Sequence, residues 1–423
     1  MTATTLPVSP DQSQRWRAVM AASIGNALEW FDFVVYGFFA VTMAKLFFPT
    51  ENETVSLLLA LGTFGVTFFM RPLGAIVFGS FADRYGRKAT FNLTITIMMV
   101  GTAIIAFAPT YSSIGLFAPI LIVAARMVQG FSAGGEFGSA TAFLAEQNPE
   151  RRGFFASWQF ASQGLTTILA TAIGATLAST LTTEQIDTWG WRIPFIFGLL
   201  IGPVAYYIRS HIDETMEFQS TQHSKAPLRE ALSDNKKRLL IALGTVVLST
   251  VAMYTILFMP TYATRQLGLP ATGSFMATLL TGAIQMVLIP FVGALSDRHG
   301  RLPMAFASSI AILLAIYPMF AWLAAAPTLQ TLLIVQAIIG VLIAGYMGGL
   351  PALMSDLFPT RMRTTGLSIS YSFGVAIFGG FAPFINAWLI EMTGSKLAPS
   401  FYLMLAAAIS LVALTAAHRL GLR

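Results

Sequence analysis

A short charged motif occurs twice in this chain, at corresponding points of its two halves. Residues 79–88 read GSFADRYGRK, and residues 293–302 read GALSDRHGRL. The two copies lie about half of the 423-residue chain apart, and each copy follows one apolar segment and precedes another. Repetition at a long, fixed period indicates that one multi-helix unit is used twice. The motif therefore predicts two related halves with a charged connection at the same place in each.

The composition decides what surrounds these halves. Hydrophobic residues make up 55% of the chain and charged residues only 10%, whereas soluble domains carry about 25% charged residues. Apolar runs of roughly 20 residues, long enough to cross a bilayer, recur from end to end. The chain is therefore expected to be an all-α integral membrane protein.

The same composition argues against several other classes. The net charge of +6 is spread over short loops, so no basic patch for nucleic acid is expected. The chain has no cysteine, and its four histidines show no metal-ligand spacing. No nucleophile–base pair or phosphate loop is present, because the 79–88 motif lacks the Gly-Lys-Ser/Thr ending. We expect no enzyme activity, no cofactor and no metal.

Hydropathy predicts twelve transmembrane helices in two six-helix, pseudo-symmetric bundles. Residues 1–208 form the first bundle, 209–237 a polar cytoplasmic linker, and 238–423 the second bundle. The expected spans are about 18–46, 54–81, 89–108, 113–145, 154–179, 190–208, 238–264, 272–296, 303–323, 328–354, 366–390 and 399–417.

The distribution of positive charge predicts the orientation of the bundles. Most of the 25 lysines and arginines fall in the segments that share a side with both termini. Because basic loops stay inside, both termini are expected to be cytoplasmic. The segment Met1 to Gln14 is polar and shows no cleavable signal, so the first helix is expected to act as the membrane anchor.

The repeated motif, Gly-x-x-x-Asp-Arg-x-Gly-Arg, resembles the signature of the major facilitator superfamily. Further segments narrow the resemblance to the metabolite:proton symporter family, which covers essentially the whole chain. The second copy departs from the first at Leu302, where a doubled basic residue is missing. The narrowing segments are residues 26–37 (NALEWFDFVVYG), 70–74 (MRPLG), 126–136 (RMVQGFSAGGE), 189–195 (WGWRIPF) and 376–380 (AIFGG).

The resemblance implies a function. Members of this family are proton-driven carriers in the bacterial inner membrane, and a multi-pass monomer with a small organic acid, protons and lipid as its partners is expected. Citrate or a related tri- or dicarboxylate is the leading substrate. The alternatives are α-ketoglutarate, shikimate, a zwitterionic osmolyte, a proton-antiport exporter, or a receptor that keeps the fold without coupling.

Five ionisable residues fall inside the predicted spans, all of them in the first bundle: Glu29, Asp32, Arg71, Arg126 and Glu136. A charge in a bilayer costs at least ~2.5–3.5 kcal/mol, so such residues mark pathways or pairs. Glu29 and Arg126 each lie about 16–20 Å into their helices, near the midplane where transporter sites occur. Arg71 could instead serve only to neutralise a carboxylate and fix helix packing.

The three carboxylates are the candidates for proton coupling. Glu29 and Asp32 are three residues apart and share a helix face, so their simultaneous ionisation is disfavoured and one is expected to hold a proton. Glu136 lies ~15 Å nearer the cytoplasm, as an inner relay step or as a counter-ion to Arg71.

The substrate site is predicted around Arg126, whose guanidinium can bind a carboxylate through two parallel hydrogen bonds. Neutral polar residues at similar depth would complete the site, although each could equally make an interhelical hydrogen bond. The predicted substrate residues are Asn26, Tyr36, Arg71, Arg126, Gln129, Gln159, Gln163, Tyr254 and Tyr346.

A cytoplasmic gate is predicted at the repeated motifs. Asp83 and Asp297 end equivalent helices, and the resemblance implies that each docks at a helix N-terminus of the other bundle, where the dipole favours an anion. Basic residues of the motifs would bridge to acids near those helices and hold the outward-open state. The gate residues are Asp83, Arg84, Arg87, Glu146, Asp297, Arg298, Arg301 and Asp356.

Overall fold

The computed structural model describes residues 12–85, 87–134, 136–210, 235–359 and 363–421. Every regular element in this part of the chain is helical. The first half contains α1 (Gln12–Phe38), α2 (Ala40–Phe47), α3 (Glu53–Phe69), α4 (Arg71–Tyr85), α5 (Arg87–Ala106), α6 (Tyr111–Ile114), α7 (Phe117–Ser132), α8 (Glu136–Glu146), η1 (Pro149–Arg151), α9 (Arg152–Thr180), α10 (Thr183–Gln185), η2 (Ile186–Gly190) and α11 (Arg192–Ser210).

The second half contains the longest helix of the described chain, α14, with 32 residues. Its elements are α14 (Lys236–Leu267), α15 (Ala271–His299), α16 (Arg301–Ala325), α17 (Leu329–Met347), α18 (Leu350–Leu357), α19 (Arg363–Gly374), η4 (Val375–Gly379), α20 (Ala382–Thr393) and α21 (Ala398–Arg419). The linker predicted at 209–237 falls mostly outside the described residues.

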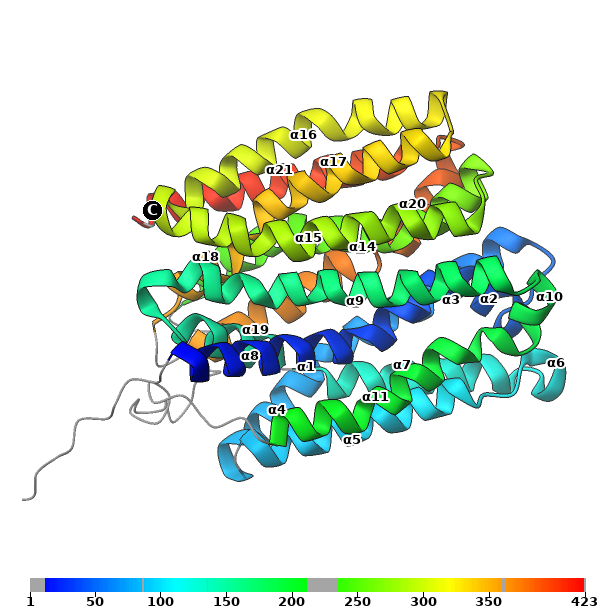
Figure 1. The fold of residues 1–423 in the computed structure, drawn as a ribbon, viewed down its shortest axis with the longest axis horizontal. Coiled ribbons are helices and arrows are strands. Elements are labelled where there is room, and N and C mark those ends of the chain that lie inside the picture. Colours follow the sequence, from blue (N-terminus) through cyan, green and yellow to red (C-terminus); the bar gives the residue numbers. More distant parts are fainter. Residues whose placement is uncertain (1–11, 86, 135, 211–234, 360–362, 422–423) are drawn as a thin grey trace, which may run out of the picture.

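The prediction of twelve transmembrane helices is confirmed. Within the described residues, nine continuous or joined helices are long and apolar enough to cross a membrane. A tenth crossing is the pair formed by α1 and α2, which is bent by 65°, and the shorter apolar helices Leu93–Ala106 and Arg192–Val204 complete the set. The helices run side by side in two groups, one formed by the first half and one by the second (Figure 1).

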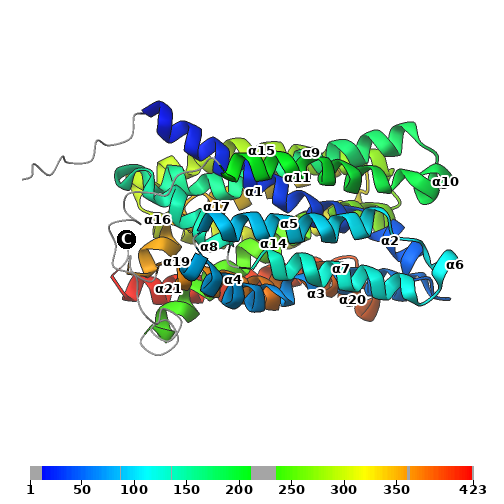
Figure 2. The same ribbon diagram turned by 90° about the horizontal axis from the view of Figure 1, so that it is seen from below.

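The helix ends gather at two faces of the molecule (Figures 1 and 2). The start of α1, the end of α21, α8, α18 and the start of α19 lie at one end, which we call the terminal face. The other end, with α2, α6 and α10, is called the opposite face. At the opposite face, the Asn52 side chain caps α3 by accepting hydrogen bonds from the backbone N–H groups of Thr54 (2.8 Å) and Val55 (3.3 Å), which are otherwise unpaired at a helix start.

The repeated motif is more helical than the loop predicted from the sequence. In the second copy α15 continues to His299 and α16 begins at Arg301, so Gly300 alone separates the two helices. Gly300 has φ +90°, a left-handed conformation that residues with a Cβ atom rarely adopt. In the first copy α4 runs to Tyr85 and α5 begins at Arg87, which places the charged residues on helix ends.

The two bundles meet along α9 and α15, which lie next to each other over their whole length (Figure 1). Glycines on both helices let the backbones touch. A Cβ atom on Gly153 would lie 2.5 Å from the carbonyl oxygen of Gly293, and one on Gly164 would lie 2.7 Å from the backbone nitrogen of Met286. Small residues at such contacts are typical of tightly packed membrane helices. We call this contact the α9–α15 seam.

Two crossings of the second half are interrupted along their length. The break between α17 and α18 falls at Gly348 and Gly349. The crossing formed by α19 and α20 contains a π-helical turn, η4, over Val375–Gly379. Such turns occur frequently at functional sites, and this one coincides with the AIFGG segment of the family resemblance.

Candidate functional site

Arg126 is the centre of the site. Its side chain extends from α7 and is 0% exposed, with the guanidinium 4.5 Å from the ring centre of Tyr36 and 5.3 Å from that of Phe33. Nη1 donates a hydrogen bond to Oε1 of Gln129 at 2.9 Å. Nε and Nη2 have no hydrogen-bond partner in the described part of the chain. These two atoms form one edge of the guanidinium, the edge that binds a carboxylate with two parallel bonds.

Arg71 lies beside Arg126 in an aromatic box. Its guanidinium is 4.4 Å from the ring centre of Trp30, 5.0 Å from Phe33 and 4.7 Å from Phe68. Ring faces stabilise a desolvated cation by roughly 2 kcal/mol, so the rings supply part of what a counter-ion would. The site therefore brings together two buried arginines that the sequence predicted, and Phe33 contacts both of them.

Asp32 is connected to Arg126 through two neutral side chains. Thr102 on α5 donates its hydroxyl hydrogen to Oδ2 of Asp32. Nε2 of Gln129 donates to the Thr102 hydroxyl oxygen at 3.0 Å, and Gln129 in turn accepts from Arg126. The other carboxylate oxygen, Oδ1, has no hydrogen-bond partner among the described residues. Thr102 carried no signal in the sequence, since it is one of many hydroxyl residues in apolar helices.

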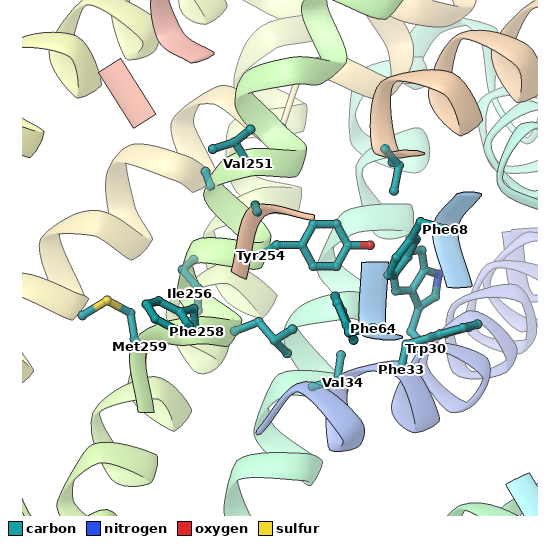
Figure 3. Packing of buried hydrophobic residues seen from close by; sticks show 14 of the residues in the cluster. Trp30, Phe33, Val34, Phe64, Phe68, Val251, Tyr254, Ile256, Phe258 and Met259 are labelled. Atoms are coloured by element: carbon teal, nitrogen blue, oxygen red, sulfur yellow. The ribbon is translucent and has the colours of Figure 1, made fainter. Parts of the chain in front are cut away.

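The second bundle contributes Tyr254, on α14, to the same region. Figure 3 shows its hydroxyl group pointing toward the rings of Phe68 and Trp30. The ring of Tyr254 packs edge-on against Phe64 and Phe68, with centroid distances of 5.6 and 5.0 Å. The hydroxyl has no hydrogen-bond partner in the described chain, so a polar group that faces the arginines remains available for a ligand.

Tyr371, on α19, was not predicted from the sequence. It lies close enough to Arg71 and Tyr254 to interact with both electrostatically, and beside Gln163, whose amide has no hydrogen bond of good geometry. Its ring stacks on Phe137 of α8, with 3.4 Å between centroids and 4° between planes. Tyr371 therefore belongs to the polar site and, through its stack on Phe137, to a contact between the two bundles.

Several predicted substrate residues make hydrogen bonds to other parts of the protein. Asn26 and Gln159 bind each other across α1 and α9: Asn26 Nδ2 donates to the Gln159 carbonyl at 3.2 Å, and Gln159 Nε2 donates to Asn26 Oδ1 at 3.1 Å. The Tyr36 hydroxyl donates to the Ala60 carbonyl at 3.2 Å, although its ring supports Arg126. Tyr346 donates to the Thr245 carbonyl at 2.7 Å within the second bundle.

The two remaining acids differ from Asp32 in their surroundings. Asp32 is buried at 6% exposure, whereas Glu29 and Glu136 are only partly buried. Both glutamates also take part in interactions of their own. The hydrogen-bonded connection to Arg126 starts at Asp32.

At the terminal face, the Asp297 carboxylate sits on the N-terminus of α9. The backbone N–H groups of Gly153 and Phe154 donate to its two oxygens at 2.7 and 3.0 Å. Because the N-terminus of a helix is a positive dipole end, it favours this anion. The contact joins the two bundles at the seam.

Further ion pairs extend this contact. Arg301 lies 3.5 Å from Asp297 and also pairs with Asp356, which Arg152 contacts at 3.0 Å. Arg152 was not among the predicted gate residues. Glu146 takes part in an interaction, and Arg298 lies in the last turn of α15. The side chains of Asp83, Arg84 and Arg87 lie outside the described part of the chain.

At the opposite face the bundles are also in contact. Arg265, near the end of α14, pairs with Glu53 at the start of α3. Phe39 of the first bundle lies 6.2 Å from Phe275 of the second, measured between ring centres. The gate contacts at the terminal face therefore coexist with contacts between the two bundles at the opposite face.

Described residues show no group of three or more His, Cys, Asp or Glu side chains that could hold a metal ion. The chemistry of the site is that of two guanidinium groups, one buried carboxylate and neutral hydroxyl and amide groups. Such a site can bind an anion and can take up one proton at Asp32.

Comparison with known families gives a match for each half of the chain. Residues 18–236 match the sugar (and other) transporter family, and residues 241–420 match the major facilitator superfamily. The boundary between the two matches falls at the linker that the sequence predicted.

Individual relatives cover nearly the whole chain. A citrate-proton symporter of Klebsiella pneumoniae is 38% identical over 94% of this chain and 90% of its own length. A proline/betaine transporter of Salmonella typhimurium is 34% identical over 95% of this chain and 83% of its own. An alpha-ketoglutarate permease of Escherichia coli is 33% identical over 100% and 98%.

A solved structure with the same fold is that of the proton:xylose symporter XylE bound to a bromo-deoxyglucose. It superposes with a TM-score of 0.76 at 14% identity and covers 96% of this chain and 95% of its own. At this identity the likeness concerns the fold alone.

Proposed function

This chain belongs to the major facilitator superfamily, and we propose that it carries a small organic carboxylate into the cell together with protons. Citrate or a related tri- or dicarboxylate is the leading substrate. The name of the 38% identical relative, a citrate-proton symporter, supports this choice.

The observation that carries the proposal is the unpaired edge of Arg126. Nε and Nη2 are buried without an acceptor in the described chain, and an unpaired buried donor on a charged group is costly. A substrate carboxylate would satisfy both donors at once. The Tyr254 hydroxyl and the Arg71 guanidinium, from the two bundles, would hold further carboxylate or hydroxyl groups of the same molecule.

Proton coupling is assigned to Asp32. When its carboxylate is ionised it compensates the positive charge of Arg126, and when it takes up a proton that charge is free to attract an anion. Proton binding and anion binding therefore favour each other, as symport requires. Glu29 and Glu136 remain secondary candidates for the path by which the proton enters or leaves.

Alternating access would proceed by rocking of one bundle against the other. Asp297, Arg301, Asp356 and Arg152 would form the gate at the terminal face, and Glu53 with Arg265 would form a contact to be broken at the opposite face. Asp83, Arg84, Arg87, Glu146 and Arg298 would complete the gate by the symmetry of the repeat.

The setting of this activity is a membrane. We place the protein in the bacterial inner membrane as a monomer, with the terminal face and both termini toward the cytoplasm, where the positive charges concentrate. The relatives named above are transporters, and no catalytic reaction is proposed.

A second candidate substrate class is supported by the comparisons. A relative named as a proline/betaine transporter is 34% identical over 95% of the chain. A zwitterion also carries a carboxylate that Arg126 could bind, so an osmolyte symporter would use the same edge. α-Ketoglutarate and shikimate share that carboxylate as well.

The test is uptake into liposomes that contain the purified protein. Labelled citrate should accumulate when the outside is made acidic, and Asp32→Asn or Arg126→Gln should abolish the accumulation. A matched control is Thr171→Val, because the hydroxyl of Thr171 bonds only to its own helix, at the carbonyls of Thr167 and Ile168. If the gradient drives uptake of proline, betaine or α-ketoglutarate but not of citrate, that solute class is the substrate and the mechanism stands. Absence of gradient dependence for every solute would overturn symport.

A further inference from the structure

We propose that Thr102 and Gln129 are positioning residues that transmit the protonation state of Asp32 to the guanidinium of Arg126. The inference rests on the proposed symport function and adds its coupling route. Neither residue needs to touch the substrate or to exchange its own proton with water.

Gln129 fixes the direction of the connection. Its side chain is 0% exposed, with Arg126 Nη1 on one side at 2.9 Å and the Thr102 hydroxyl on the other at 3.0 Å. A guanidinium nitrogen can only donate, so the atom that faces Arg126 must be the amide oxygen. The amide nitrogen is therefore turned toward Thr102, and Thr102 must accept.

Thr102 then has a single hydrogen with two acceptors in reach. The hydroxyl oxygen contacts Oδ2 of Asp32 and lies 3.1 Å from the carbonyl oxygen of Met98. While Asp32 is ionised, the carboxylate is the stronger acceptor and takes the hydrogen. All three bonds then point from Arg126 toward Asp32, and bonds in such a chain strengthen one another.

Uptake of a proton by Asp32 reverses the last of these bonds. Water delivers the proton, the carboxylate becomes a carboxylic acid, and its new O–H donates to Thr102. The Thr102 hydrogen turns to the Met98 carbonyl, and the oxygen accepts from both Asp32 and Gln129. A hydroxyl has capacity for these three bonds, so the switch needs rotation about one side-chain bond and no helix movement.

Protonation of Asp32 weakens the hydrogen bond that holds Arg126. With Asp32 neutral, the chain no longer ends on an anion, so the Gln129 amide is less polarised and holds Nη1 less firmly. The guanidinium is then free to adjust to an incoming carboxylate on its Nε and Nη2 edge. The backbone supports this arrangement, because a Cβ atom on Gly101 would lie 2.5 Å from Cγ of Gln129.

Other charged and titratable groups surround this connection. Helix α11 presents Gly198 to Asp32. On α9, the amide of Gln159 bonds to Asn26, and the amide of Gln163 lies beside Tyr371. The hydrogen-bonded path from Arg126 to Asp32 runs only through Gln129 and Thr102 among the described residues. The titratable groups that act electrostatically on Arg126 or Arg71, besides Asp32 and the two arginines themselves, are Tyr36 on α1, Tyr254 on α14 and Tyr371 on α19. The two other acids predicted for proton coupling are Glu29 on α1 and Glu136 on α8.

The first experiment measures KM for labelled citrate in liposomes over a range of pH. In the wild type, KM should rise as the medium becomes alkaline. Thr102→Val has nearly the same shape but no hydroxyl, and it should reduce the ratio of alkaline to acidic KM about tenfold, the value of a hydrogen bond to a charged group. Gln129→Met should do the same from the other end. Thr102→Ser should restore the wild-type profile, and Thr171→Val should not alter it.

The second experiment separates failure of the connection from failure of the proposed function. Infrared difference spectra between acidic and alkaline buffer report the carboxylic acid C=O band of Asp32, identified by its loss in Asp32→Asn. The band should shift in Thr102→Val and stay in place in Thr102→Ser and Thr171→Val, whether or not citrate is transported. An unshifted band together with a wild-type KM profile in Thr102→Val would overturn the connection. If the wild type does not transport citrate but the Asp32 band shifts in Thr102→Val, citrate is not the substrate and the connection between Asp32 and Thr102 stands.

Discussion

Gly198 of α11 lies directly against the carboxylate of Asp32, and a Cβ atom at this glycine would overlap Oδ1. We expect Gly198→Ala to push Asp32 away from Thr102 and to cost about 1–3 kcal/mol of stability, as overpacking does. Proton-driven uptake should fall at least about tenfold, by loss of one bond to a charged group.

The matched control is Gly202→Ala, one turn further along α11, where the added methyl would meet the flexible side chain of Met99. Uptake assays and thermal unfolding of both variants check the prediction. Equal effects of the two substitutions would show that helix packing, and not the position of Asp32, is what matters.

Asp32→Asn should fix the site in its neutral state. The amide can still accept from Thr102 but cannot release a proton, so accumulation against a citrate gradient should be lost. Exchange of labelled for unlabelled citrate needs no net proton movement and should continue. Loss of both activities would assign Asp32 to substrate binding instead of coupling.

Arg126→Lys should keep the charge and lose the paired donors. Lysine offers a point charge instead of the planar edge formed by Nε and Nη2, so KM for citrate should rise about tenfold or more. A monocarboxylate and a tricarboxylate measured side by side would show whether one carboxylate is held there. A KM within about twofold of the wild-type value would show that the Nε and Nη2 edge of Arg126 does not bind the substrate.

Asp297→Asn should loosen the terminal face. The carboxylate accepts from two backbone N–H groups of α9 and lies near Arg301, so its neutralisation weakens charge-assisted bonds worth about 1.5–3 kcal/mol each. The chain has no cysteine, so a thiol introduced at buried Ser157, near the Asp297 contact, would report opening of the terminal face. Its labelling rate should rise about tenfold.

Glu150→Gln serves as the control for that experiment, because Glu150 is exposed on the same face. A labelling rate unchanged by Asp297→Asn would mean that this contact does not limit opening.

Cross-linking should lock the opposite face. Glu53 and Arg265 belong to different bundles and form an ion pair, so cysteines at both positions joined by a thiol-reactive spacer should stop transport, and reduction of a cleavable spacer should restore it. The ion pair formed by Lys45 and Asp187 connects α2 to η2 within the first bundle. A cross-link there should leave transport intact, and inhibition by both cross-links would argue against movement between bundles.

Much of this structure could be predicted from the sequence, because its main constraint is the bilayer. Apolar runs must form helices there, and the duplicated motif fixes their arrangement in two halves. Arg126 and Asp32 could also be predicted, since a charge in a membrane is costly unless it has a function.

The connections between these residues could not be predicted. Thr102 and Tyr371 become part of the site only through the packing of α5 and α19 against their neighbours, which no local pattern encodes. Asn26 and Gln159 have the same chemistry as site residues, yet they bind each other. Arg71 was weighed as a partner for a carboxylate, and the structure surrounds it with the rings of three aromatic residues.

The α9–α15 seam bears on how this molecule can move. Two helices in backbone contact at Gly153 and Gly293, and again at Gly164 and Gly282, can roll against each other with little change in buried area but cannot slide without collision. The seam can therefore serve as the axis about which one bundle rotates against the other. The balance between inward and outward forms is then set by the charged and aromatic contacts on the terminal and opposite faces. Single substitutions in the contacts of the two faces should shift the resting conformation, and substitutions at the glycines of the seam should instead weaken the fold.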